Sequence, residues 1–148
     1  MGIAEVIRER FRESFELYEA LAAELPEASL ALKLPGIPSN AIGDQLWCVV
    51  GARESFARAI RAGEWSGFSC SLTAGETRDS DAVGAGLARS AEGVLAAIGD
   101  LDPLDDDRCR FALRLLEHET AHHGQLIRYL YGLRLPIPAP WRAHYALD

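Results

Sequence analysis

The sequence lacks several features that would place it in a specialised class of protein. Lys33 is the only lysine, Lys and Arg together number 15 against 22 Asp and Glu, and the net charge is −7. A general nucleic-acid binder needs clustered basic residues to neutralise phosphates, so this balance argues against nucleic acid as a partner. No apolar run approaches the ~20 residues that cross a bilayer, so we expect no membrane-spanning helix.

A secretion signal and a disulfide framework are missing as well. Residues 1–12 mix charged and apolar side chains, without the continuous apolar stretch or the small-residue cleavage site of a secretory signal. The three cysteines, Cys48, Cys70 and Cys109, are an odd number without compact spacing, which predicts reduced thiols. We therefore expect a cytoplasmic protein.

The chain does contain enough apolar material for one core. Its 148 residues suit a single domain over residues 1–148, with 49% apolar and 25% charged residues. Apolar residues recur at three- and four-residue steps in four stretches, and no strand pattern is convincing. These stretches predict helices at about 3–25, 42–61, 81–98 and 103–131, and hence an all-α four-helix bundle.

The segments between and after these helices differ in character. Asp102 and Pro103 supply a capping carboxylate and then a proline where no amide is needed, which is a strong start signal for the fourth helix. Residues 63–79 are apolar for a loop, so we expect them to pack against the bundle. After Gly132, three prolines and Trp141 predict an irregular C-terminal tail that lies across the bundle.

Three of the four histidines fall close together in the fourth predicted helix. Residues four apart stand one above the other on a helix, so His118 and His122 present two imidazoles to one point. This is a standard pairing for a transition metal, and we predict that the two residues bind a divalent ion. The alternative is that they are core or surface histidines bonded to other protein groups. His123 points about 100° away from His122 and is not expected to bind the same ion.

Glu119 lies toward the middle of the apolar face of this helix, where a carboxylate is costly unless it is paired. We expect it to bond a ligand histidine, a water or an arginine. Residues His118 to His122 also match H-E-x-x-H, the zinc-protease pattern whose glutamate is the general base, and this makes Glu119 a candidate catalytic residue. The extended pattern needs Gly and His where this chain has Gln125 and Arg128, so a zinc-dependent hydrolase is the second interpretation.

Two protein ligands are too few for a metal ion, and Cys48 is the best candidate for a third. It lies midway along the second predicted helix, which passes the middle of the fourth helix if the two pack antiparallel. A thiolate is a good ligand for zinc. A free cysteine is also common as a small buried hydrophobic residue, so both interpretations of Cys48 stand open at the level of sequence.

Two segments resemble the DinB/YfiT-like family of four-helix-bundle metalloproteins. Residues 42–54 resemble its second helix, where a metal-binding histidine typically precedes two apolar residues. Residues 118–126 resemble its last helix, where two histidines four apart precede a Gly-Gln pair. Cys48 stands at the family's first histidine position, so the resemblance implies either a Cys-His-His site or a site that has lost one ligand. His123 stands where many relatives have arginine.

The resemblance also implies a bundle with a long crossover connection, frequent homodimers, and zinc or nickel as the ion. Characterised relatives include S-transferases and isomerases that use low-molecular-weight thiols such as bacillithiol or mycothiol on small-molecule substrates. Many members have no known activity. The specific hypothesis is thus a metal-dependent thiol S-transferase, and the non-enzymatic alternative is a vestigial, stress-related bundle.

Overall fold

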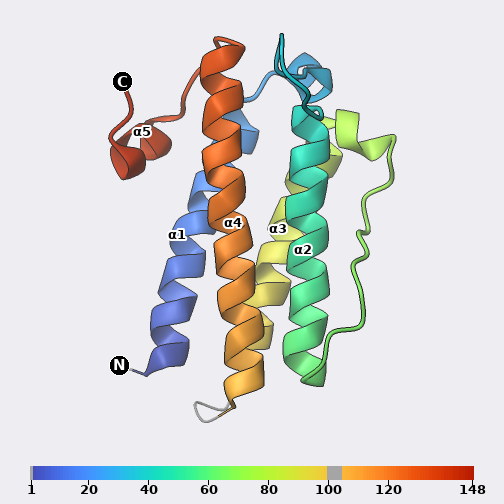
Figure 1. Ribbon diagram of the computed structural model, residues 1–148, viewed down its shortest axis with the longest axis vertical. Helices are drawn as coiled ribbons and strands as arrows, with labels where there is room; N and C mark the ends of the chain where they lie inside the picture. Colours follow the sequence, from blue (N-terminus) through green and yellow to red (C-terminus); the bar gives the residue numbers. More distant parts are fainter. Residues whose placement is uncertain (1, 100–104) are drawn as a thin grey trace.

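The computed structural model describes residues 2–99 and 105–148, and this part of the chain is helical with no strand (Figure 1). The long helices that pack side by side are α1 (Ile3–Glu24), α2 (Ile42–Ala62), α3 (Ser80–Gly99) and α4 (Asp106–Gly132). The short helices are η1 (Glu27–Ala31), η2 (Glu76–Arg78) and α5 (Ala139–Tyr145). The predicted all-α bundle is confirmed.

The ends of the long helices follow local chemistry. Gly63 ends α2 in the left-handed conformation, with φ of 78°, which glycine adopts without a Cβ penalty. Asp105 caps α4 by accepting a hydrogen bond from the backbone N–H of Arg108. The start signal predicted at Asp102 and Pro103 lies outside the described residues.

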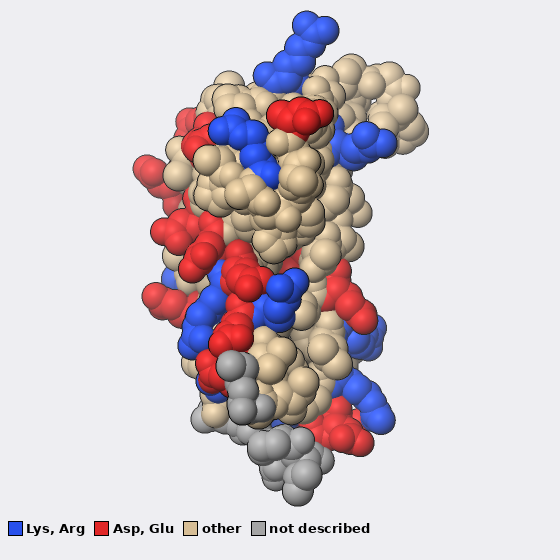
Figure 2. All heavy atoms as spheres, turned by 90° about the vertical axis from the view of Figure 1, so that its left-hand side faces the viewer, with Lys and Arg blue, Asp and Glu red and all other residues tan. Residues whose placement is uncertain are grey.

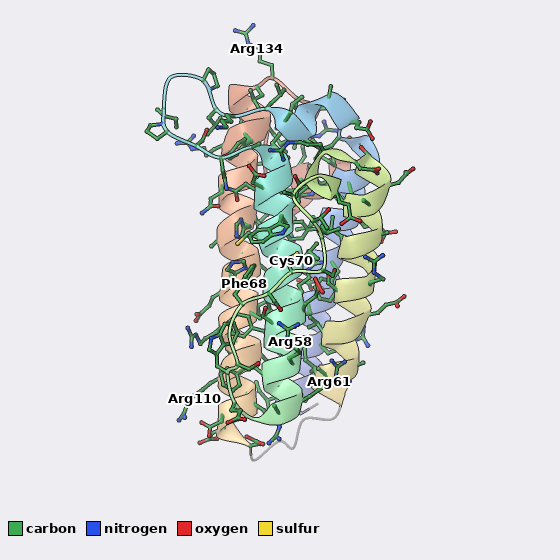
Figure 3. All side chains as sticks on the ribbon, turned by 90° about the vertical axis from the view of Figure 1, so that its right-hand side faces the viewer. Arg58, Arg61, Phe68, Cys70, Arg110 and Arg134 are labelled. Carbon is green, nitrogen blue, oxygen red and sulfur yellow. The ribbon has the colours of Figure 1, made fainter. Side chains whose placement is uncertain are left out.

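Residues 63–79 run back along the outside of α2 before α3 begins, with Phe68 and Cys70 marking their path (Figure 3). Ser69 N donates to Ser55 Oγ at 3.0 Å, and Trp47 Nε1 donates to the carbonyl oxygen of Leu72 at 3.0 Å. This return segment therefore runs antiparallel to α2. Since Leu72 is buried, the expectation that this apolar connection packs against the bundle is confirmed.

The return segment makes α2 and α3 run in the same direction. Asp44, near the start of α2, pairs with Arg78, which lies just before α3. Arg61, near the end of α2, donates to the carbonyl oxygen of Gly93 in the second half of α3. The two helices therefore begin at the same end of the bundle, and a long link is needed to join the end of one to the start of the other.

In contrast, α4 runs antiparallel to α2. Tyr129, near the end of α4, donates to the carbonyl oxygen of Asn40 just before α2. Arg108, near the start of α4, donates to the carbonyl oxygen of Ile60 near the end of α2 at 2.7 Å. The middle of one helix thus faces the middle of the other, as the prediction for Cys48 requires. Within residues 2–99 and 105–148, every helix is too short or too polar to span a membrane.

The tail is more regular than the irregular segment that its prolines predict. Pro140 lies in the first turn of α5, where no amide donor is required. Trp141 is fully buried and donates from Nε1 to the carbonyl oxygen of Leu17 in α1 at 2.6 Å. The prolines therefore begin a short helix that an anchoring tryptophan holds against the bundle.

At Gly43 a neighbouring backbone lies close to α2. A Cβ atom at this position would lie 2.1 Å from the carbonyl oxygen of Thr77. Alanine is favoured over glycine within helices by ~1 kcal/mol, but the backbone of η2 cannot yield without losing its own contacts. We therefore expect Gly43→Ala to lower the free energy of unfolding by roughly 2 kcal/mol, measured by urea denaturation.

The matched control is Gly84→Ala in α3, where a Cβ would meet no atom within 4 Å. It should raise stability by roughly 0.5–1 kcal/mol, because it removes backbone freedom from the unfolded chain. Equal effects from the two variants would show that the approach at Gly43 is not tight.

Candidate metal centre

Cys48 of α2 and His118 and His122 of α4 converge on one point. Their ligand atoms all lie within 4.8 Å of one another. His118 Nε2 is 3.2 Å from His122 Nε2 and 3.5 Å from Cys48 Sγ. Bond lengths near 2.1 Å for nitrogen and 2.3 Å for sulfur put two ligands of a tetrahedral zinc roughly 3.4 Å (N···N) or 3.6 Å (N···S) apart. The two distances from His118 therefore fit one shared ion.

Burial sets the protonation of this cluster. It lowers the pKa of His122 to about 4, with the neighbouring His118 as the second cause, and it also lowers the pKa of His118. The negative charge of Glu119 opposes both shifts. Both imidazoles are thus neutral at neutral pH, which is the form that binds a metal. Burial raises the pKa of the Cys48 thiol, so binding of an ion there would have to release its proton.

Gln45 orients one of the two imidazoles. Its Oε1 accepts a hydrogen bond from His122 Nδ1 at 2.5 Å, while its Nε2 donates to Asn40 Oδ1 at 2.8 Å. A proton on Nδ1 leaves the Nε2 lone pair of His122 facing Cys48 and His118. Hydrogen bonds of this kind fix the tautomer of metal-binding histidines.

His118 is held differently, because its Nδ1 is buried without a hydrogen-bond partner among the described residues. Leaving a buried polar atom unsatisfied costs about 1–3 kcal/mol. Its Nε2 faces the Nε2 lone pair of His122. The two imidazoles and the Cys48 thiol thus form one donor set. Such donors suit a soft or borderline cation, so these residues fit a metal ion.

Glu119 is adjacent to the cluster in sequence but belongs to a different network. Its side chain is fully buried, and Arg53 reaches both oxygens, with Nε 2.5 Å from Oε1 and Nη2 3.0 Å from Oε2. Ser14 Oγ also donates to Oε2, at 2.7 Å. Of the expected partners, the arginine is confirmed. A carboxylate engaged in this way is not placed to accept a proton from a metal-bound water, so the geometry gives the H-E-x-x-H interpretation no support.

The network of Glu119 extends to α5 through His123. Ser14 has one proton, which it gives to Glu119, so His123 Nε2 at 2.9 Å donates to Ser14 Oγ. His123 Nδ1 then accepts from the Tyr145 hydroxyl at 2.6 Å. Burial lowers the pKa of His123 to about 4, in keeping with this neutral tautomer. His123 therefore faces α1 and α5 and not the cluster, as its position on the helix predicts.

Sequence reasoning missed four of the residues that shape this region. Arg53 carries a recognisable signal, since it is a charged residue on the apolar face of a predicted helix. Gln45 carries a weaker one, as a polar residue one turn before Cys48. Ser14 and Tyr145 carry none, because their roles depend on which helices come to lie beside α4.

No model of a known family matches the chain, and no curated protein matches it significantly. Fold and site together define the class as a helical bundle with a candidate Cys-His-His metal centre.

The Arg53–Glu119 pair separates a structural role for Glu119 from a catalytic one. Glu119→Gln leaves the guanidinium buried without a counter-charge, so we expect the free energy of unfolding to fall by roughly 3–5 kcal/mol. Metal stoichiometry of the folded fraction should stay unchanged, because Glu119 is not among the clustered donors. The control is Glu117→Gln, an exposed position on the same helix, which should alter stability by less than about 0.5 kcal/mol. A stable Glu119→Gln protein would argue against this structural role.

Acid should destabilise the metal-free protein through its buried imidazoles. The folded-state pKa of His123 is about 4, below the ordinary value of 6.5, so its contribution to stability is complete above pH 6.5 and is lost as the pH falls through 4. By about pH 5 this loss should be on the order of 2 kcal/mol, measured by urea denaturation in the presence of a chelator.

The variant His123→Gln should reduce this pH dependence, and the buried imidazoles of His118 and His122 should account for what remains. If His123→Gln retains the full acid sensitivity, the destabilisation originates elsewhere in the chain.

Proposed function

We propose that this protein binds one divalent metal ion, zinc or nickel, through Cys48, His118 and His122, and that it is a metal-dependent enzyme acting on small molecules. The observation that carries the proposal is the convergence of the three donors within 4.8 Å. Thiolate and imidazole suit zinc and nickel, whereas magnesium and calcium prefer oxygen ligands. Three protein ligands leave one position open on a four-coordinate ion, which is the arrangement of catalytic zinc sites.

The resemblance to the DinB/YfiT-like family narrows this proposal to a low-molecular-weight-thiol S-transferase, and the helical bundle supports it. A bound ion would supply Lewis acidity and lower the pKa of a thiol or water at its open position. The chain's own residues supply orientation: Gln45 fixes the tautomer of His122, and burial keeps both imidazoles neutral. Cys48 as a thiolate brings negative charge, which should make activation weaker than with a third imidazole.

Metal analysis of protein purified without a histidine tag tests the site. His118→Ala and His122→Ala should each abolish stoichiometric binding of zinc or nickel, because each removes one imidazole of the pair on α4. Cys48→Ala should lower the affinity, and His144→Ala, at an exposed position, should leave it unchanged. Unchanged metal content in the double variant of His118 and His122 would contradict the proposed site.

Activity assays on the same proteins separate the functional alternatives. A thiol S-transferase should conjugate a model electrophile only when a small thiol and the metal are both present, and Cys48→His should raise this activity while keeping the fold. A hydrolase should instead cut denatured casein without any thiol. A vestigial bundle should do neither, even when loaded with metal.

A further inference from the structure

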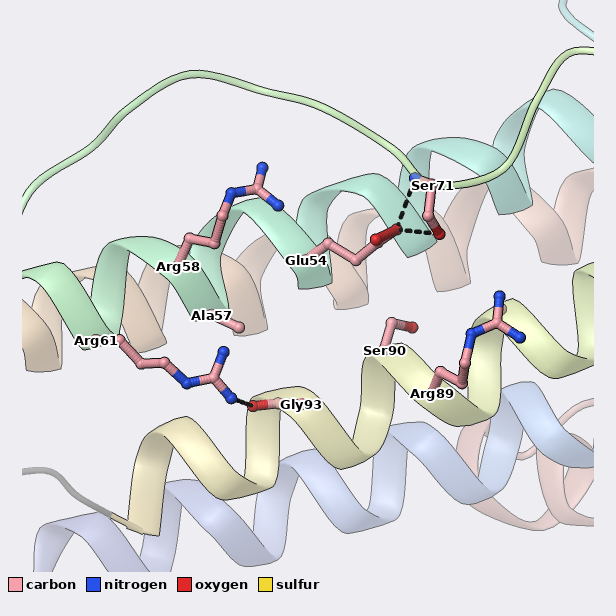
Figure 4. Close-up of a pocket in the computed structure, with 9 residues that line it drawn as sticks. Glu54, Ala57, Arg58, Arg61, Ser71, Arg89, Ser90 and Gly93 are labelled. Carbon is pink, nitrogen blue, oxygen red and sulfur yellow. Dashed lines mark hydrogen bonds between the residues drawn. The ribbon is translucent and has the colours of Figure 1, made fainter.

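A polar pocket lies between α2 and α3, and it shares no residue with the metal cluster. It has a volume of about 240 Å³, and arginines line both of its walls (Figure 4). Arg58 and Arg61 come from α2, three residues apart and therefore on one face of that helix. Arg89 comes from α3, on the opposite wall.

The three arginines keep donors for a ligand. Arg58 Nη2 donates to the hydroxyl groups of Ser55 and Ser69, and Arg61 Nη2 donates to the carbonyl oxygen of Gly93. Each guanidinium has five N–H donors, so most remain uncommitted. Among the ion pairs formed by the described residues, none includes any of the three.

Two carboxylates near these arginines offset part of their positive charge. Glu54 lines the pocket, but its Oε1 accepts hydrogen bonds from Ser71 N and Ser71 Oγ, both at 3.0 Å. The second carboxylate, Glu76, is exposed. Hydrogen bonds from Thr73 lower its pKa, and the positive charge of Arg89 lowers it slightly further. Three cations against one lining carboxylate leave the pocket positive in a chain whose net charge is −7. By contrast, acidic side chains gather along the α1 side of the bundle (Figure 2).

Two serine hydroxyl groups and a glycine complete the lining of the pocket. Ser90 is buried and gives its proton to the carbonyl oxygen of Leu87, while Ser71 stands beside Glu54 at the rim. A Cβ atom at Gly93 would meet nothing within 4 Å, so the absence of a side chain there leaves space. One water occupies about 30 Å³ of liquid, so the pocket has room for a phosphate group with a small organic remainder. It is smaller than the roughly 300–1,000 Å³ of sites for larger ligands.

We propose that this pocket binds a phosphate group, either the free ion or the phosphate of a small metabolite. The planar guanidinium makes paired, charge-assisted hydrogen bonds to phosphate oxygens, which is why arginine is favoured in such sites. With Arg58 and Arg61 on one wall and Arg89 on the other, a tetrahedral oxyanion receives donors from two sides. The pocket and the metal centre share no residue, so each can be tested without the other.

Isothermal titration calorimetry with inorganic phosphate and with glycerol phosphate tests the site, at an ionic strength held constant with sodium chloride. We expect saturable one-to-one binding with a roughly millimolar or lower dissociation constant. Arg89→Gln should weaken binding roughly tenfold or more, since one charge-assisted contact is lost. Arg89 is exposed, so its replacement should leave the melting temperature unchanged.

Two further variants test the effect of charge outside the pocket and of space within it. Arg110→Gln removes the same charge from an exposed site on α4 outside the pocket and should not alter binding. Gly93→Leu fills the pocket without altering charge and should abolish binding. Tighter binding of glycerol phosphate than of phosphate assigns the site to a phosphorylated metabolite, and equal binding assigns it to the free ion. No saturable binding up to about 10 mM, or an equal loss with Arg110→Gln, would overturn the proposal.

Discussion

The buried ion pair between Arg53 and Glu119 is the interaction on which the arrangement of the four long helices depends. Arg53 lies on α2 and Glu119 on α4, while Ser14 of α1 donates to the carboxylate and the Leu87 carbonyl of α3 accepts from the guanidinium. Charges in an apolar interior cost several kcal/mol each unless their hydrogen bonds are matched, and here all four helices contribute to the match. A shift of any one of them along its axis leaves a buried charge without its partner.

The same register brings the candidate metal ligands together. Cys48 precedes Arg53 by little more than one turn of α2, and His118 directly precedes Glu119 on α4. Because α2 and α4 run antiparallel, the contact that joins Arg53 to Glu119 leaves Cys48 close to His118 and His122. The ion pair therefore acts on the metal centre through helix position, without touching a donor atom.

Local sequence patterns predicted the features that depend on a single helix. The three- and four-residue periodicity located the long helices, and the four-residue spacing of His118 and His122 placed both rings on one face. Pairing between helices was harder to predict. An arginine partner for Glu119 was expected, but Arg53 is 66 residues away in sequence, and only the packing of α2 against α4 selects it. The arginine pocket was missed for the same reason, since Arg89 meets Arg58 and Arg61 only because the return segment makes α3 run parallel to α2.

The H-E-x-x-H match shows why a short motif needs its structural context. Glu119 could act as a general base only if its carboxylate were free to face the metal centre, and here Arg53 and Ser14 hold both of its oxygens. In this bundle the histidines face Cys48, while Glu119 faces Arg53 and His123 faces Tyr145. One stretch of α4 thus carries candidate metal donors on one side and a structural network on the other. The two sides share no side chain, so the network acts on the metal donors only through the helix register that it sets.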